Sequence, residues 1–402
     1  SLCAGGCASV GRLGAIPSSE ERQGLKAVAS FLNVRLLGLL VLALVLFGTM
    51  GAVVISCMRL RSAFPAQAAP SYDETYSLSP SYLLLSNWQD MMAWISTGVP
   101  DPFINSANLS IQAIYLGPEG ILPLKVFVMV QGTPENASLA ENNTVQVGFP
   151  GGHASFMLAP GSRQLDINAS SLKELGFLVD ANVTSYVEES QGIVLETSPR
   201  VSVFLLGGTL SAERSSGGVQ LRGEGTGHAL LEICVNSSQP VSYLTLAALD
   251  RNRTSAWLSE SKHPGLAGPL LREYYLSLLL MKDDQNPYLG DFAASPSPVY
   301  LAAWVRDGSF SAMALQSAGH LDSALKYWRW MASVMIANGS SAGTWYTKYN
   351  FWDGQPVLGW PTEYDGIGLY QVGLWKFYAA ALASGESSNL TKMFSVGDAF
   401  YE

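Results

Sequence analysis

The sequence predicts a multidomain protein with an N-terminal transmembrane helix, a β-sandwich domain and then the first helices of an α/α barrel. Three patterns lead to this prediction. Residues 36–58 carry no charge, short apolar runs separated by Gly, Pro and Ser fill roughly residues 76–255, and helical periodicity follows. The predicted boundaries are 1–34 for a cytoplasmic tail, 35–61 for a transmembrane signal anchor, 62–75 for a juxtamembrane spacer, 76–255 for the β-sandwich domain, 256–266 for a linker and 267–402 for a partial α/α barrel.

The uncharged stretch runs from Leu36 to Met58, between Arg35 and Arg59. A helix of about 20 residues crosses the hydrocarbon core of a bilayer, and a buried core helix of this length would show a polar face. Residues 66–68 (Ala-Gln-Ala) resemble a cleavage site, so a cleaved signal peptide is the alternative. We favour an uncleaved signal anchor, because the run is longer than the roughly 7–15 apolar residues of a signal peptide.

Asn-x-Ser/Thr sequons indicate on which side of the membrane the chain lies. All nine follow the uncharged stretch, more than chance would supply in a Ser-rich chain. Because N-glycans are added to exposed sites of exported chains, we expect a single-pass glycoprotein of the cell membrane, with its N-terminus inside and its bulk extracytoplasmic. The flanking basic residues orient the segment only weakly. The sequon asparagines are Asn108, Asn136, Asn142, Asn168, Asn182, Asn236, Asn252, Asn338 and Asn389.

Charge and cysteine usage exclude several classes of function. Residues 62–402 carry seventeen Lys and Arg against thirty Asp and Glu, which disfavours nucleic acid and anionic membrane surfaces but not a neutral glycan. Of Cys3, Cys7, Cys57 and Cys234, only the last lies well inside the part expected outside the membrane, so no disulfide framework is available there. The four histidines show no metal-ligand spacing. We expect no catalytic metal, no cofactor and no nucleic-acid partner.

The region before residue 255 has the pattern of short strands with turn signals between them, typical of a β-sandwich. It contains no constellation of chemically active residues, so we expect a structural role, packing against the helical part. A separate carbohydrate-binding role is the alternative. Expected strands are 111–116, 124–130, 145–148, 155–158, 201–206, 229–235 and 243–246, and expected turns include 117–118, 151–152, 161–162 and 215–218.

After the predicted linker, apolar residues recur with helical period, and the loops carry the Trp, Tyr, Gly and Asp residues. Paired helices with functional loops at one end are typical of an α/α barrel. The aromatic residues with helical spacing are expected to be core. Expected helices are 270–282, 309–318, 321–337, 362–383 and one that begins at Leu390.

The most chemically loaded stretch is Tyr300-Leu-Ala-Ala-Trp304-Val-Arg306-Asp307, just before an apolar helical run. Arg306 and Asp307 offer a donor fork and an acceptor, and Trp304 and Tyr300 offer flat apolar faces with polar edges. A sugar, with an apolar ring face and a rim of hydroxyls, suits this combination. The alternative is an ordinary helix start, at which Asp307 meets the dipole and Arg306 pairs locally.

This stretch and its neighbours form an ordered series that resembles glycoside hydrolase family 15, which comprises the glucoamylases, glucodextranases and related trehalases. The resemblance covers roughly residues 265–385 and is more specific as a series than in any one piece. Its parts are Asp291-Phe-Ala-Ala-Ser-Pro-Ser-Pro, Tyr300-x3-Trp304-Val-Arg306-Asp307-Gly-Ser-Phe, Ala318-Gly-His-Leu-Asp-Ser-Ala, Gly343-Thr-Trp-Tyr and Trp360-Pro-Thr-Glu363-Tyr-Asp365-Gly.

The resemblance implies a six-hairpin glycosidase with an (α/α)6 barrel of twelve helices as its catalytic domain, preceded in prokaryotic members by a β-sandwich. Family positions matching Arg306 and Asp307 hydrogen-bond hydroxyls of the sugar whose bond is cut. Those matching Tyr300 and Trp304 shape the pocket around that ring. The general acid and base of the family match positions beyond Glu402, so we expect half of a sugar-binding pocket here and neither catalytic carboxylate.

Trp360 and Asp365 are the further substrate contacts that the resemblance implies, because glucoamylases have a tryptophan shortly before an Asp-Gly helix start. This spacing varies within the family, and Trp360 and Trp345 could instead pack on the barrel. Glu363 reads better as a first-turn acid that complements the helix dipole than as a catalyst. Asp353 is likewise not assigned to the catalytic pair.

The resemblance therefore implies a membrane-anchored, extracytoplasmic glycoside hydrolase that acts on an oligosaccharide or polysaccharide. It would release glucose from the non-reducing ends of an α-glucan by acid/base hydrolysis with inversion, and the fragment alone would be inactive. Two rivals stay open: a non-catalytic glycan-binding or cell-envelope protein with a glucoamylase-like barrel, and a regulatory homologue.

Overall fold

The computed structural model describes residues 80–100, 108–140, 143–190, 192–360 and 362–385. Within these ranges, no helix is both long enough and apolar enough to cross a membrane. The predicted tail, signal anchor and spacer lie outside the described residues, as do Asn142, Asn389 and the helix expected from Leu390.

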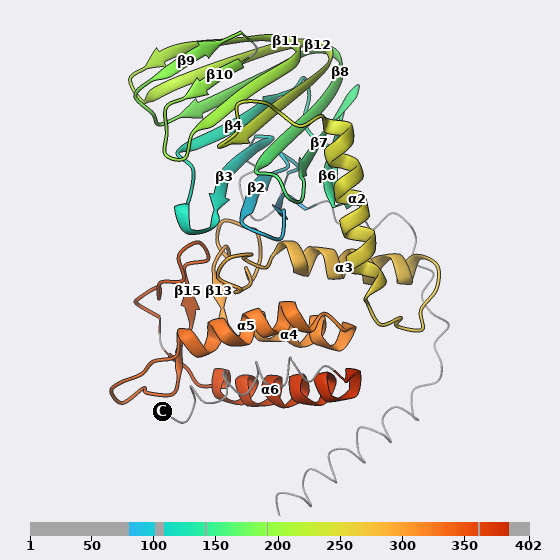
Figure 1. The fold of residues 1–402 in the computed structure, drawn as a ribbon, viewed down its shortest axis with the longest axis vertical. Coiled ribbons are helices and arrows are strands. Elements are labelled where there is room, and N and C mark those ends of the chain that lie inside the picture. The colour runs from blue at the N-terminus through green and yellow to red at the C-terminus, as the bar shows by residue number, and fades with distance from the viewer. Residues whose placement is uncertain (1–79, 101–107, 141–142, 191, 361, 386–402) are drawn as a thin grey trace, which may run out of the picture. The chain divides into compact units, whose positions relative to one another are not determined.

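The first half of the described chain forms a twelve-stranded antiparallel sheet (Figure 1). One path through the sheet has the order β1-β2-β3-β4-β8-β12-β11-β10-β9, and a branch β5-β6-β7 joins it at β8. The strands are β1 (Tyr82–Ser86), β2 (Met91–Ser96), β3 (Ser110–Leu116), β4 (Leu124–Met129), β5 (Asn136–Ala140), β6 (Thr144–Phe149), β7 (Gly152–Leu158), β8 (Gln164–Ala181), β9 (Tyr186–Glu189), β10 (Gly192–Leu195), β11 (Val201–Ser215) and β12 (Gly218–Val235).

The long strand β8 is where the sheet divides. Its first half pairs with β7 and its second half with β4, whereas β12 follows its other edge along most of its length. Apolar side chains from both branches, among them Val126, Phe156, Phe177 and Leu231, meet in one buried core. The domain is therefore β-sandwich-like.

Six of the seven expected strands are confirmed, within β3, β4, β6, β7, β11 and β12. In β4, for example, Leu124, Val126 and Val128 are buried and alternate with more exposed side chains, as in a strand with one face on the core. The expected turns at 151–152, 161–162 and 215–218 each separate consecutive strands. Strand β8 was not expected, because the polar pairs Ser170-Ser171 and Lys173-Glu174 interrupt the alternation of polar and apolar residues in its centre.

The seventh expected strand, 243–246, is wrong, because these residues form the first turn of helix α2 (Tyr243–Ser259). Ser242 caps this helix, since its hydroxyl accepts a hydrogen bond from the Thr245 amide. The buried positions of α2 are Leu246, Asp250 and Thr254. Two of these three are polar, so hydrophobic periodicity could not reveal the helix. The helix also takes up residues 256–259, which were expected to belong to the linker.

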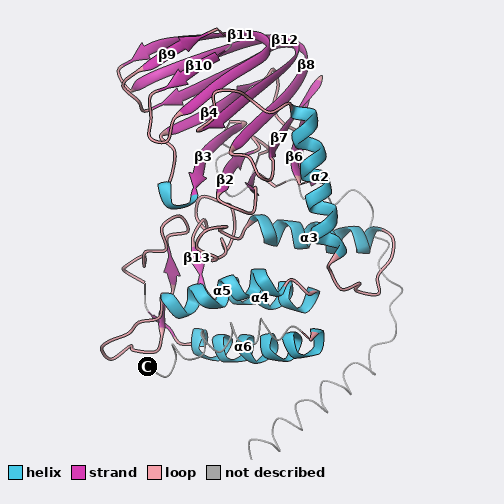
Figure 2. Cartoon of the chain, in the orientation of Figure 1, coloured by secondary structure: helices cyan, strands magenta, loops and turns pink. Residues whose placement is uncertain are grey.

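In the described residues after α2, four further helices follow, and the loops between them contain short two-stranded ladders (Figure 2). The expected helices 270–282, 309–318, 321–337 and 362–383 are confirmed with shifted ends. The helices are α3 (Pro269–Asp283), α4 (Val305–Ala318), α5 (Leu321–Ser333) and α6 (Asp365–Ser384). The short strands are β13 (Ala303–Trp304), β14 (Trp345–Tyr346), β15 (Lys348–Tyr349) and β16 (Thr362–Glu363).

Helices α4, α5 and α6 pack on one another around large aromatic side chains. Tyr327, Trp328 and Phe377 are fully buried in this second core, as expected for aromatic residues at helical spacing. The helix α3 connects the two cores, because Leu279 packs with the sheet and Leu278 packs with the helices. The indole Nε1 of Trp88 also donates a hydrogen bond of 2.7 Å to the buried Asp283 carboxylate at the end of α3.

Candidate functional site

The candidate site lies where α4 and α6 begin. Strand β13 leads directly into α4, so that Trp304 is the last residue before the helix and Arg306 and Asp307 lie in its first turn. Both charged side chains are 46% exposed. The site therefore combines a fixed backbone with accessible polar groups.

Gly308 allows the first turn of α4 to pack closely on α5. A Cβ atom at this position would lie 2.6–2.9 Å from the ring of Tyr327, closer than real Cβ contacts. The Tyr327 hydroxyl donates a 2.7 Å hydrogen bond to the Val305 carbonyl and lies 3.1 Å from the Ser309 hydroxyl. Burial raises the pKa of Tyr327 above its ordinary value, and the nearby Asp307 charge adds to this effect. The phenol therefore stays protonated and holds the turn.

Gly366 performs the corresponding function at the start of α6. A Cβ atom here would lie 3.1 Å from both the Trp345 ring and Val305, so a larger residue would press these neighbours away by a few tenths of an ångström. With glycine at this position, Asp365 comes near Arg306, with 3.7 Å between Asp365 Oδ2 and Arg306 Nη1. Arg306 Nε lies 3.9 Å from Asp307 Oδ2. The guanidinium therefore lies between two carboxylates from different helices. Arg306, Asp307 and Asp365 are called the Arg306 group below.

Aromatic rings form a wall beside this charged group. The ring centroid of Trp304 is 5.4 Å from that of Trp360, with an edge-on angle of 76°, and 6.2 Å from that of Tyr300. Trp360 is 49% and Tyr300 52% exposed. The indole Nε1 of Trp304 is buried and has no hydrogen-bond partner. Such a donor is costly to bury unpaired, and a ligand hydroxyl could satisfy it after a small movement of the rings.

Lys348 also belongs to this wall, although it was not among the residues expected at the site. In the β13–β15 ladder it is the direct partner of Trp304. Its Nζ lies 4.6 Å from the Trp360 ring centroid and 5.4 Å from that of Trp304, which are cation–π distances. Two-residue strands carry no periodic signal, so only the Lys-Tyr-Asn context in an aromatic-rich loop could have pointed to it.

The loop that leads to the site contains a buried acid, Asp291. Both of its carboxylate oxygens lack hydrogen-bond partners, and burial, with a smaller contribution from Asp353, raises its pKa well above the ordinary value. Asp353 itself is exposed and accepts a hydrogen bond from the Gln355 amide in a turn.

All six residues singled out as substrate contacts therefore meet in one region. Tyr300, Trp304 and Trp360 adjoin through their rings, and Arg306, Asp307 and Asp365 adjoin through their charges. Their role in binding stays a prediction. Among the described residues there is no group of three or more His, Cys, Asp or Glu side chains placed to hold a metal.

Six sequon asparagines lie exposed on the described surface, and Asn168 is half-buried on β8. This exposure suits glycan attachment without testing it. The exposed asparagines are Asn108, Asn136, Asn182, Asn236, Asn252 and Asn338.

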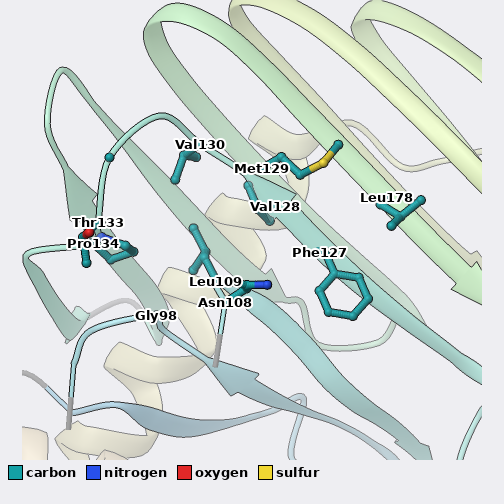
Figure 3. Close-up of a pocket in the computed structure, with 11 residues that line it drawn as sticks. Gly98, Asn108, Leu109, Phe127, Val128, Met129, Val130, Thr133, Pro134 and Leu178 are labelled. Carbon is teal, nitrogen blue, oxygen red and sulfur yellow. The ribbon is translucent and has the colours of Figure 1, made fainter. Parts of the chain in front are cut away.

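A hollow of about 600 Å³ lies in the sheet domain, away in sequence from the site residues (Figure 3). Phe127, Met129 and Leu178 line it with Asn108, and none of the described residues that line it is charged. It shares no residue with the Arg306 group, and no chemistry is assigned to it.

The fold has a known counterpart in a bacterial glucoamylase, solved in complex with acarbose. The superposition has a TM-score of 0.54 at 13% sequence identity, and it covers 78% of this chain and 57% of that one. No family model and no curated protein matches the sequence. The similarity shows a glucoamylase-like fold, and the chain spans somewhat more than half the length of its counterpart.

Proposed function

We propose that the Arg306 group and its aromatic wall bind the terminal sugar of an α-glucan in a glycoside hydrolase of glucoamylase type. The observation that carries this proposal is the apposition of Arg306 with Asp307 and Asp365 beside the Trp304–Trp360 pair. The enzyme would release glucose from non-reducing ends with inversion. The fold of the acarbose-bound glucoamylase supports the proposal, because its known ligand is a carbohydrate mimic.

The geometry matches the chemistry of a pyranose. The exposed indole of Trp360, backed by the largely buried Trp304, offers apolar surface to the C–H face of the ring. The Arg306 guanidinium would donate hydrogen bonds to hydroxyl oxygens at the rim of the ring, and the carboxylates of Asp307 and Asp365 would accept hydrogen bonds from hydroxyl groups there. Charged partners make such hydrogen bonds stronger than neutral ones.

Hydrolysis by inversion needs a protonated acid and a base that holds water, with about 6.5–9.5 Å between the two carboxyl groups. We assign neither role to a carboxylate within the described ranges. Asp307 and Asp365 lie against a guanidinium, an arrangement suited to holding hydroxyls rather than to moving protons. Binding and hydrolysis are therefore separate parts of the proposal and are tested separately.

We further propose that the protein is held at the cell membrane by residues 36–58, with the sequon-bearing part outside. The exposed sequon asparagines support this location. Expression in a glycosylating host should add mass that an endoglycosidase removes, and external protease should remove the sequon-bearing part while sparing the first 34 residues and the membrane segment that follows them. The opposite protection pattern would reverse the proposed orientation.

Titration with maltose and with acarbose, followed by tryptophan fluorescence, tests binding. The variant Trp360→Ala should weaken binding at least tenfold, whereas Trp375→Ala, which removes another exposed tryptophan on α6, should not. Equal loss in both variants would contradict the site. Glucose release by a chain long enough to include the acid and base that the resemblance implies, with the anomer followed by NMR, then distinguishes a hydrolase from the rival glycan-binding protein, which would bind but yield no glucose.

A further inference from the structure

Two carboxyl groups lie opposite each other on one face of the sheet, far from the sugar site in sequence. Asp166 of β8 and Glu232 of β12 are direct partners in the register, so their side chains share a face with Cβ atoms about 4.5–5.5 Å apart. They are 0% and 2% exposed. Asp166 Oδ2 and Glu232 Oε2 are buried without hydrogen-bond partners. Each acid of the pair therefore has one buried carboxylate oxygen whose hydrogen-bonding capacity is not satisfied.

The side chains around the pair supply no positive charge. On the same face, the register places Gln164, Cys234, Met157 of β7 and Phe204 of β11 next to the two acids. The titratable neighbours are Cys234, a thiol whose pKa burial raises to about 12, and Tyr243 of α2. Burial raises the pKa of both Asp166 and Glu232 to about 7, and Asp166 adds to the effect on Glu232.

The pair is linked to the start of α2 through one amide side chain. Gln164 Nε2 donates to Asp166 Oδ1 at 2.8 Å and to the Val241 carbonyl at 2.9 Å. Gln164 Oε1 accepts a 2.8 Å hydrogen bond from the Val241 amide. Val241 immediately precedes the Ser242 cap of α2. Met157, the register partner of Asp166 on β7, packs with Leu246 in the first turn of the helix.

We propose that the Asp166–Glu232 pair takes up a proton when the chain folds and acts as a pH-sensitive latch for the first turns of α2. Two ionised carboxylates without a counter-ion in a dry site repel each other and require water. Tyr243 and Leu246 in the first turn of α2 pack with Met157, the cross-strand neighbour of Asp166, so displacement of this turn would admit water to the pair. With one proton on the pair, this turn closes over it.

The direction of the pH effect follows from the raised pKa values. Below about pH 4, both the folded and the unfolded chain hold their protons, and the contribution of the pair to stability is fully present. Between pH 4 and 7 the unfolded chain ionises first, so folding takes up protons and stability falls as pH rises. Above pH 7 the loss is complete and constant.

Thermal unfolding of the full chain between pH 4 and 8 tests the latch, with Asp166→Asn and Glu232→Gln as variants. Glu224→Gln is the matched control, since Glu224 lies on the same strand β12 with an exposed side chain. Because other buried acids titrate in the same range, the quantity to compare is the difference between variant and wild type. In either latch variant, the folding equilibrium constant should change with pH by up to tenfold less per pH unit than in wild type. The control variant should show the wild-type pH dependence.

A crossover separates the latch from a merely structural role. The latch variants should unfold at a lower temperature than wild type at pH 4.5 and at a higher temperature at pH 8. Hydrogen exchange of residues 243–247 at pH 8 should be slower in Asp166→Asn than in wild type. An equal shift of the midpoint at every pH would overturn the proposal. So would a rise in the wild-type midpoint with added calcium that both variants lack, since a cation would then neutralise the pair.

Discussion

Arg306 at the start of α4 lies 3.7 Å from Asp365 at the start of α6, although 58 residues separate them in the chain. This relationship depends on two glycines, Gly308 and Gly366, which let aromatic rings pack where side chains would otherwise stand. The site is thus a product of helix packing and not of one local motif. Predictions about it therefore concern both the charged groups and the packing that places them.

Replacing Arg306 by Lys keeps the positive charge but removes the planar fork that reaches two carboxylates at once. If the fork holds a sugar, the affinity for maltose or acarbose should fall by about 1.5–3 kcal/mol, roughly tenfold to a hundredfold. Calorimetric titration measures this loss. The same change at Arg329, exposed on α5, is the control. Unchanged affinity in Arg306→Lys would remove this residue from the site.

Gly366→Ala places a methyl group 3.1 Å from both Trp345 and Val305. Overpacking of this kind costs about 1–3 kcal/mol, only partly offset by the higher helix propensity of Ala. The variant should unfold more easily and also bind sugar more weakly, because the start of α6 must move away from Arg306. Gly368→Ala in the same helix is the control.

No atom lies within 4 Å of a Cβ atom at Gly368, so its replacement by Ala should be neutral or stabilising by up to about 1 kcal/mol. Denaturant unfolding of both variants decides between the two expectations. If the two glycines respond alike, the close approach at Gly366 does not matter to stability.

The elements that could be predicted from the sequence are those in which periodicity and burial agree. Helix α5 has its polar residues on one face and Tyr327, Trp328 and Met331 on the other, and it was expected within four residues of its end. Strand β4 alternates clearly and was expected within one residue. Helix α2 was missed because Asp250 and Thr254 occupy its buried face.

The residues of the candidate site likewise divide into those that the sequence reveals and those that only packing brings together. Residues Tyr300 to Asp307 are contiguous, so their chemistry is visible in the sequence. The approach of Asp365 to Arg306 was expected only from the family resemblance, and the place of Lys348 arises from a ladder of two residues. The orphaned Trp304 indole nitrogen is a property of packing, which no pattern of residue types contains.

We expect the folded chain to lose stability in acid because of the buried His320. It stacks on Trp257 with 3.7 Å between ring centroids, and its Nε2 lies 2.8 Å from the Ser261 hydroxyl. Burial lowers its pKa to about 4, with a smaller effect of Lys282. The contribution of neutral His320 is therefore present above about pH 6.5 and is lost as pH falls toward 4, at up to about 1.4 kcal/mol per pH unit.

The variant His320→Gln should remove this acid-dependent part of the unfolding free energy, and His263→Gln, at an exposed position, should leave it unchanged. Urea unfolding at pH 4.5, 5.5 and 6.5 measures the slopes. Parallel slopes for wild type and His320→Gln would show that the imidazole stays neutral or becomes charged equally in both states.

Lys348→Met tests whether the aromatic wall is held in place by the ammonium group. The cation–π contacts to Trp360 and Trp304 stabilise the wall by about 0.5–2 kcal/mol, with the larger value for a desolvated ammonium group. Their loss should let the exposed Trp360 ring move. We expect sugar affinity to fall about threefold to thirtyfold and acrylamide quenching of tryptophan fluorescence to rise.

Lys348→Arg keeps the cation over the rings and should restore most of the affinity, whereas Lys376→Met on the exposed face of α6 should change neither quantity. A fall in affinity that Lys348→Arg does not restore would assign Lys348 a direct hydrogen bond to the sugar, and full affinity in Lys348→Met would mean that the wall is held by packing alone.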